Sequence, residues 1–242
     1  MIGIIGAVLS LAVCVFWYYP CIKLQGDNRT LEKKDYINIG LKYGLLYTCL
    51  LIIVTEITWD VFAKFLPFKG LPADLFTDFF RAALLEEFFK FTGFLLAVRA
   101  VKLVNKIDYV MAAGMIGMVY GIVEKAVTGN PIPVILGLVF PMHLMWQFNQ
   151  GGHYYEYKHA KEAGDSVLAR KEFFLAVAVP FVFHGCWDSM LDLVSYFINK
   201  EEATPQIIGG VLLLITIVIA VFYMVKTIRF VRRLAREAGS MV

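Results

Sequence analysis

Seven polar residues that could act together in hydrolytic chemistry are spread over four apolar stretches of this 242-residue chain. A charge at the centre of a membrane helix costs roughly 2.5–3.5 kcal/mol on insertion scales. Seven such groups would oppose insertion by something on the order of 10–20 kcal/mol if each were charged and unpaired. We therefore expect them to meet one another and to form a functional site. They are Glu86, Glu87, Lys90, Glu124, His143, His184 and Asp188.

The first group is the pair of adjacent glutamates with the lysine that follows them. Glu86 and Lys90 are four residues apart, with the acidic partner first, which is the favoured order for an ion pair on one helix face. Glu87 points about 100° away on the helix and is left for another partner. We expect one glutamate to be tuned by its ion pair and the other to act as a general base on water. The alternative is that both glutamates only pair with lysines to hold a bundle together.

The two histidines at membrane depth can bind a metal or transfer protons. His184 and Asp188 lie four residues apart on one helix face, so the carboxylate can orient the imidazole or bind a metal beside it. His143 lies in another apolar stretch. Glu124 either faces the same cavity or pairs with Lys125 near the water surface.

The composition places these residues in a membrane protein. Apolar residues make up 59% of the chain, against about 45–50% in a soluble domain. The excess lies in blocks long enough to cross a bilayer as helices, which takes about 20 residues. The predicted fold class is all-α, a polytopic membrane helix bundle of about seven transmembrane helices. We expect these spans near 2–20, 38–63, 79–98, 107–127, 131–149, 173–198 and 206–228.

The loops between the expected spans are short, so the bundle is predicted to be a single transmembrane domain over residues 1–242. The seven polar residues fall in a core at 79–198, with accessory helices at 2–63 and 206–228. No internal repeat is evident, which argues against the common repeat-built transporters.

The placement of basic residues predicts the orientation. Sixteen lysines and arginines fall in the 20–37, 99–106 and 158–171 loops and the C-terminal tail, and only four fall on the other side. By the positive-inside rule, the N-terminus is predicted outside and the C-terminus in the cytoplasm. At 1.5 Å per residue, the seven polar groups then lie between the outer rim and about the midplane. We therefore expect one cavity that opens to the extracytoplasmic side.

The order of these motifs resembles the PrsW family of intramembrane proteases, which belong with the CAAX-type prenyl-protein endopeptidases in a broader clan. The resemblance covers residues 86 to 188: EExxK, a glutamate in a G-x-x-E context, a membrane histidine followed by glycines, and HxxxD. The CAAX branch has EExxxR and often ends its last motif in asparagine. Lys90 at the closer spacing and Asp188 at the end both favour the PrsW branch.

The resemblance implies an intramembrane endopeptidase of the cell membrane. It implies cleavage on the outer side of membrane-anchored regulatory proteins, with anti-sigma factors as the substrate class, and membrane lipid as the other partner. Nothing in the sequence indicates a nucleic-acid partner. The implied active-site residues are Glu86, Glu87, His143, His184 and Asp188, with Glu124 and Lys90 as supporting members.

Two mechanisms are compatible with these residues. In the first, Glu86 or Glu87 takes a proton from water while His143 and His184 hold the oxyanion. In the second, His143, His184 and Asp188 bind zinc, which accepts two histidines and a carboxylate and keeps a fourth position for water. The sequence does not decide between them.

Three other functions remain open. Intramembrane carboxylates and histidines also form proton relays, so a proton- or cation-coupled transporter is the alternative from another class. A CAAX-type prenyl-protein endopeptidase and a non-catalytic scaffold with a decayed site are the others.

Overall fold

The computed structural model describes residues 2–26, 30–67, 69–127, 136 and 139–240, and the regular elements in these ranges are helices. The prediction of an all-α fold is confirmed. The elements are α1 (Ile2–Leu24), α2 (Lys33–Ile39), η2 (Gly40–Leu45), α3 (Leu46–Phe65), α4 (Leu71–Thr77), η3 (Asp78–Ala83), α5 (Leu84–Ala100), α6 (Lys106–Val127), α8 (Met142–Glu162), α9 (Ser166–Ile198) and α10 (Ala203–Gly239). The two η segments are π-helical turns.

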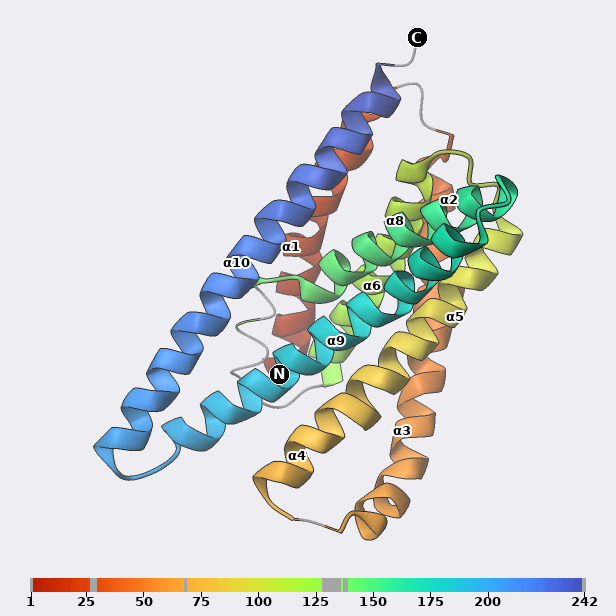
Figure 1. Ribbon diagram of the computed structural model, residues 1–242. Coiled ribbons are helices and arrows are strands. Elements are labelled where there is room, and N and C mark those ends of the chain that lie inside the picture. The colour runs from red at the N-terminus through yellow and green to blue at the C-terminus, as the bar shows by residue number, and fades with distance from the viewer. Residues whose placement is uncertain (1, 27–29, 68, 128–135, 137–138, 241–242) are drawn as a thin grey trace.

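The chain runs back and forth between two ends of an elongated bundle (Figure 1). The connections from α1 to α2, from α5 to α6 and from α8 to α9 lie at one end, together with the C-terminus. The connections from α3 to α4 and from α9 to α10 lie at the other end. Consecutive long segments therefore run in opposite directions.

Helix α6 lies at the centre of the bundle and packs against α1, α5, α8 and α10. Its residues from Ile107 to Met118 are all buried. Many of them are small or flexible, including alanines, glycines and methionines, which lets neighbouring helices approach from several sides. The core around α6 continues into α1, α8 and α10.

Apolar side chains also cover the outside of the bundle. Residues such as Ile4, Phe16, Ile57 and Phe222 are exposed by more than 60%. Exposing such a surface to water would cost free energy, whereas lipid can cover it. Four helical segments within the described ranges are long and apolar enough to cross a membrane: Ile4–Leu24, Lys33–Thr55, Lys106–Val127 and Ala203–Gly239. These correspond to the spans expected at 2–20, 38–63, 107–127 and 206–228, so the chain has the character of a membrane protein.

Two further expected spans are helices that carry most of the polar site. The expected spans at 79–98 and 173–198 fall on η3 with α5 and on α9. In α5 the apolar sequence is interrupted by Glu86, Glu87 and Lys90.

The expected span at 131–149 differs from the structure in where its helix begins. Residues 128–135 and 137–138 lie outside the described ranges. Phe140 is not helical, and Pro141, which has no backbone N–H, precedes the first residue of α8. His143 therefore lies in the first turn of α8 and not deep within a continuous helix.

Helix α10 is the longest element, with 37 residues. At 1.5 Å per residue it is about 55 Å long. Its C-terminal part carries five of the chain's basic residues, at positions 226, 229, 232, 233 and 236.

Candidate active site

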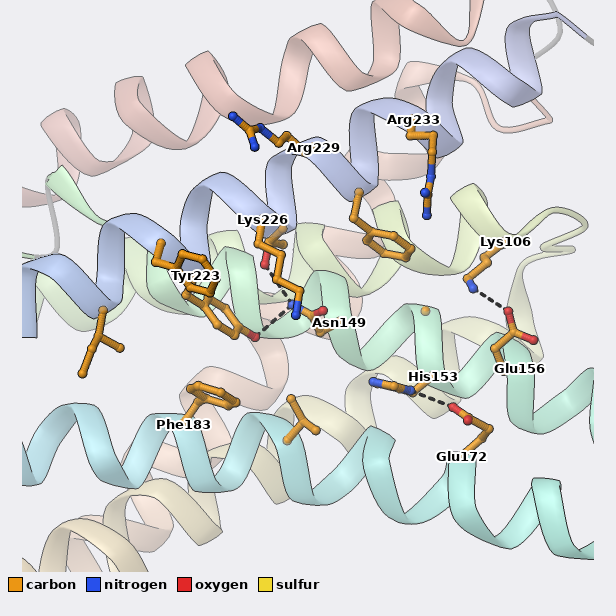
Figure 2. A pocket seen from close by; sticks show the side chains of 16 residues that line it. Lys106, Asn149, His153, Glu156, Glu172, Phe183, Tyr223, Lys226, Arg229 and Arg233 are labelled. Carbon is orange, nitrogen blue, oxygen red and sulfur yellow. Dashed lines mark hydrogen bonds and ion pairs between the residues drawn. The ribbon is translucent and has the colours of Figure 1, made fainter.

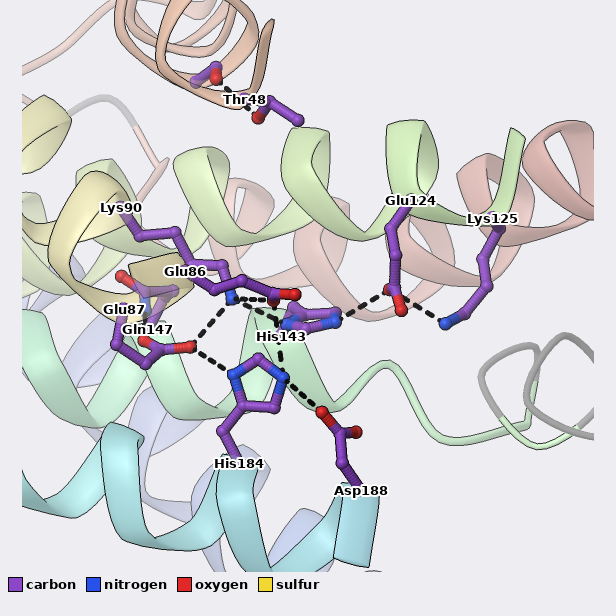
Figure 3. Close-up of polar contacts among 11 residues, drawn as sticks. Thr48, Glu86, Glu87, Lys90, Glu124, Lys125, His143, Gln147, His184 and Asp188 are labelled. Atoms are coloured by element: carbon purple, nitrogen blue, oxygen red, sulfur yellow. Dashed lines mark hydrogen bonds and ion pairs between the residues drawn. The ribbon is translucent and has the colours of Figure 1, made fainter. Parts of the chain in front are cut away.

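The seven residues singled out from the sequence meet in one polar network inside the bundle (Figure 3). They come from four helices: α5, α6, α8 and α9. Each of them lies within 3.4 Å of at least one other member. The sequence analysis expected these residues to meet, and the structure gives the contacts through which they do so.

Glu87 and Lys90 form the closed interior of the network. The Lys90 Nζ atom donates to Glu87 Oε1 at 2.7 Å, and both side chains are buried. His184 Nδ1 lies 2.9 Å from the same Oε1 atom, and Gln147 Nε2 donates to Oε2 at 2.7 Å. Glu87 thus has three close partners. A carboxylate held in this way has little capacity left for a reacting water.

Glu86 occupies the border of the network. Its Oε2 atom is 3.4 Å from Lys90 Nζ and 3.4 Å from His184 Nε2, which are long contacts. Its side chain is 15% exposed, compared with 3% for Glu87. The expected ion pair between Glu86 and Lys90 is present, but Lys90 lies closer to Glu87. Glu86 is therefore more accessible to a water molecule than Glu87.

His143 connects the lysine to the glutamate of α6. Its Nδ1 atom is 2.9 Å from Lys90 Nζ, and its Nε2 atom is 2.8 Å from Glu124 Oε2. An ammonium group only donates, so Nδ1 accepts and the hydrogen on Nε2 points to Glu124. Lys125 Nζ also donates to Glu124 Oε2, at 2.8 Å. The two alternatives considered for Glu124 therefore hold together: it faces the site and pairs with Lys125.

His184 has carboxylates at both ring nitrogens. Besides Glu87 at Nδ1, Asp188 Oδ2 lies 3.0 Å from Nε2, as the spacing of four residues predicted. Both nitrogens can donate at once only in the doubly protonated ring, so this arrangement suits the imidazolium. The ring also stacks on Trp146 with a centroid distance of 4.7 Å, which fixes its plane.

The network carries more negative than positive formal charge. Four carboxylates, two lysines and two histidines are present. With neutral histidines the sum is −2, and an imidazolium at His184 reduces it to −1. Buried charges are tolerated only when they are paired, so the site favours a further proton.

Glycines on α6 allow α8 to bring His143 into this position. A Cβ atom at Gly117 would lie 2.3 Å from the His143 carbonyl oxygen, and one at Gly121 would lie 3.3 Å from the His143 ring. Gly117 has no room for a side chain, and at Gly121 the His143 ring would have to shift slightly. On α9, a Cβ atom at Gly185 would lie 2.5 Å from the ring of Phe79, so Gly185 lets η3 and its neighbour α5 dock beside His184.

A small cavity reaches the open side of the network. It has a volume of about 40 Å³ and is lined by residues that include Glu124, His143, Trp146 and Asp188. A water molecule needs a cavity volume of roughly 10–15 Å³, so this cavity has room for water. The side chains of Glu124 and Asp188 are 27% and 29% exposed. Together with Glu86 they form the accessible edge of the site.

Three residues at the site were not predicted from the sequence. Gln147 holds Glu87, Trp146 stacks on His184, and the ring of Tyr120 lies under Lys90 Nζ at 3.9 Å from its centroid. The available signal was helical spacing: Gln147 is four residues after His143, and Tyr120 is four residues before Glu124. Many other residues share such spacings with the site residues, so spacing alone did not distinguish these three.

The donor types at the site suit zinc, but their lone pairs are engaged. Within the described ranges, the side chains whose donor atoms lie within 4.8 Å of one another are Glu86, His143 and His184. Asp188, expected as a ligand, lies outside this group and contacts His184. The Nδ1 lone pair of His143 faces the ammonium of Lys90 at 2.9 Å, and a metal ion there would have to displace that cation. The arrangement does not fit a metal without rearrangement.

Comparisons with known proteins give no match. No protein-family model matches the chain, and no curated protein or solved structure is significantly similar to it.

Proposed function

We propose that this protein is an intramembrane endopeptidase that hydrolyses a peptide bond in membrane-anchored protein substrates near the extracytoplasmic side. The observation that carries the proposal is the network of Figure 3, in which an accessible carboxylate, Glu86, borders a buried lysine and an imidazole. The Glu86 carboxylate can act as a base, the lysine supplies a fixed positive charge, and the imidazole can donate a proton. General acid–base hydrolysis needs these three functions.

Glu86 is the residue assigned to activate water. Its contacts are the longest in the network, and its side chain is more exposed than that of Glu87. In the proposed reaction Glu86 accepts a proton from water as the water oxygen bonds to the carbonyl carbon of the scissile peptide. The same proton then passes to the leaving nitrogen as the C–N bond breaks, which regenerates the carboxylate. Glu87 holds Lys90 and His184 in place.

The developing oxyanion needs nearby donors that require no rearrangement. The imidazolium of His184 and the ammonium of Lys90 each supply positive charge 3.4 Å from Glu86. The indole Nε1 of Trp146 is buried and has no hydrogen-bond partner among the described residues. Because buried polar groups are normally satisfied, we assign this N–H to the substrate backbone.

The mechanism is proposed without a metal ion, since the His143 lone pair is engaged by Lys90.

The seven-span topology, with the N-terminus outside, is part of the proposal. It is supported by the alternating direction of the long segments, and by basic residues in the connections that share an end with the C-terminus (Figure 1).

A proton-coupled transporter is the second candidate, because the same contacts form a continuous hydrogen-bonded chain. It runs from Glu124 through His143, Lys90, Glu87 and His184 to Asp188. Proton flux into proteoliposomes measures this function directly. Proton flux without proteolysis would show a transporter and contradict the proposed protease.

The test compares membranes from cells that express the wild-type chain, Glu86→Gln, or no added protein. Newly formed protein N-termini are quantified by mass spectrometry. We expect new termini close to the outer boundary of single-span membrane proteins, present only with the wild type. Purified enzyme reconstituted with one such substrate should then produce the same terminus. If the wild type and Glu86→Gln generate the same termini at equal levels, Glu86-dependent proteolysis is excluded.

A further inference from the structure

A large cavity lies away from the active site, in a groove between α8, α9 and α10 (Figure 2). Its volume is about 890 Å³. None of the seven predicted site residues lines it. The proposed active site therefore does not explain this groove.

One part of the groove is apolar. Val179 and Phe183 of α9 face Ile219, Phe222 and Tyr223 of α10 across it. Phe222 is 71% exposed, so this part of the groove is open to the surroundings of the bundle. A hydrocarbon chain is the natural occupant of such a surface in a bilayer.

The other part of the groove is basic. Lys226, Arg229 and Arg233 of α10 line it and recur at a spacing of three and four residues, which places them on one helix face. Lys226 and Arg229 have no hydrogen-bond or ion-pair partner among the described residues. Arg233 has only an exposed contact of 3.8 Å with Glu237, which is worth little.

The remaining charges in the groove compensate one another. Lys106 is paired with Glu156, and His153 Nδ1 lies 2.7 Å from Glu172 Oε2. Glu156 is therefore already paired with a lysine, and Glu172 with a histidine. On the basic face of α10 the only ion pair is the weak contact of Arg233 with Glu237, among the described residues.

We infer that this groove binds one anionic phospholipid. Its phosphate contacts Lys226, Arg229 and Arg233, and an acyl chain lies along Phe183, Ile219 and Phe222. Basic pockets between membrane helices are suited to anionic head groups. A free phosphate would use the cations but not the apolar half, and an apolar peptide would leave the cations unpaired. This inference does not depend on the proposed protease activity.

The test is native mass spectrometry of the purified protein in detergent with added lipid. The probes are phosphatidylglycerol and phosphatidylcholine with the same acyl chains, and inorganic phosphate as competitor. We expect one phosphatidylglycerol to remain bound at concentrations where phosphatidylcholine does not. The triple variant Lys226→Gln/Arg229→Gln/Arg233→Gln should bind it at least about tenfold more weakly, since each cation near an anionic head group contributes measurably.

The matched control removes the same charge elsewhere. Lys23, Lys102 and Lys161 are exposed and do not line the groove, so Lys23→Gln/Lys102→Gln/Lys161→Gln should keep wild-type binding. Equal loss in both triple variants, equal retention of both lipids, or full displacement by inorganic phosphate would each overturn the inference. All six substituted residues have exposed side chains, and melting temperatures measured in parallel check that both variants fold.

Discussion

At the scale of single residues, the two adjacent glutamates should behave differently when each is replaced by glutamine. Glu86→Gln removes the proposed base from the accessible edge of the site, and we expect proteolysis to fall by about 10²–10⁴-fold with little change in thermal stability. Glu87→Gln leaves Lys90 and His184 without their shared carboxylate. Breaking a buried ion pair costs about 3–5 kcal/mol, so this variant should unfold at a clearly lower temperature.

The measurements are turnover of a reconstituted substrate and thermal unfolding of both variants in the same detergent. An active Glu86→Gln enzyme together with an inactive but stable Glu87→Gln enzyme would exchange the two roles. Such a result would contradict our argument from contact length and exposure.

The engaged lone pair of His143 gives a second prediction at this scale. A chelator that removes zinc should leave proteolysis unchanged, because Lys90 and not a metal ion lies at His143 Nδ1. Metal content of the purified, active protein should be well below one zinc per chain. Stoichiometric zinc in the wild type that is lost in a His143→Ala/His184→Ala double variant would show the opposite, with the histidines as ligands.

At the scale of elements, the close approach of α6 and α8 determines where His143 lies. Gly117→Ala would put a methyl group 2.3 Å from the His143 carbonyl oxygen, and overpacking of this kind typically costs about 1–3 kcal/mol. We expect lower stability and strongly reduced proteolysis. Gly210→Ala is the matched control, since a Cβ atom there meets nothing within 4 Å and helix propensity favours alanine. Equal activity of both variants would show that the position of α8 does not matter for the reaction.

At the scale of the whole molecule, the number of membrane crossings can be tested with two positions. Lys69 and Lys102 lie on opposite sides if α5 crosses the membrane. They lie on the same side if only the four most apolar segments cross it. Single cysteines at 69 and 102 are introduced into a background without the four native cysteines. A membrane-impermeant maleimide should label position 69 in intact cells and position 102 only after permeabilisation. Labelling of both positions in intact cells would exclude the seven-span topology.

Sequence reasoning found the helical class and the seven polar residues because both depend on local signals. Long apolar blocks indicate membrane helices, and a spacing of four residues puts Glu86 with Lys90 and His184 with Asp188. It did not find the closer pairing of Lys90 with Glu87, although these residues are three apart on the same helix. It also did not find the contacts of Gln147 with Glu87 and of Trp146 with His184, because these depend on how α8 packs against α5 and α9. The start of α8 after Pro141 was also missed, because an apolar run was taken as one continuous helix.

The length of α10 links this protein to the thickness of its membrane. About 55 Å of helix is far more than the roughly 30 Å of a typical hydrocarbon core, so α10 must tilt, project into water, or do both. In a thicker bilayer more of the helix lies within hydrocarbon, and the residues nearest the boundary are those around Lys226. The depth at which this basic face meets the head groups therefore varies with the acyl-chain length of the surrounding lipids.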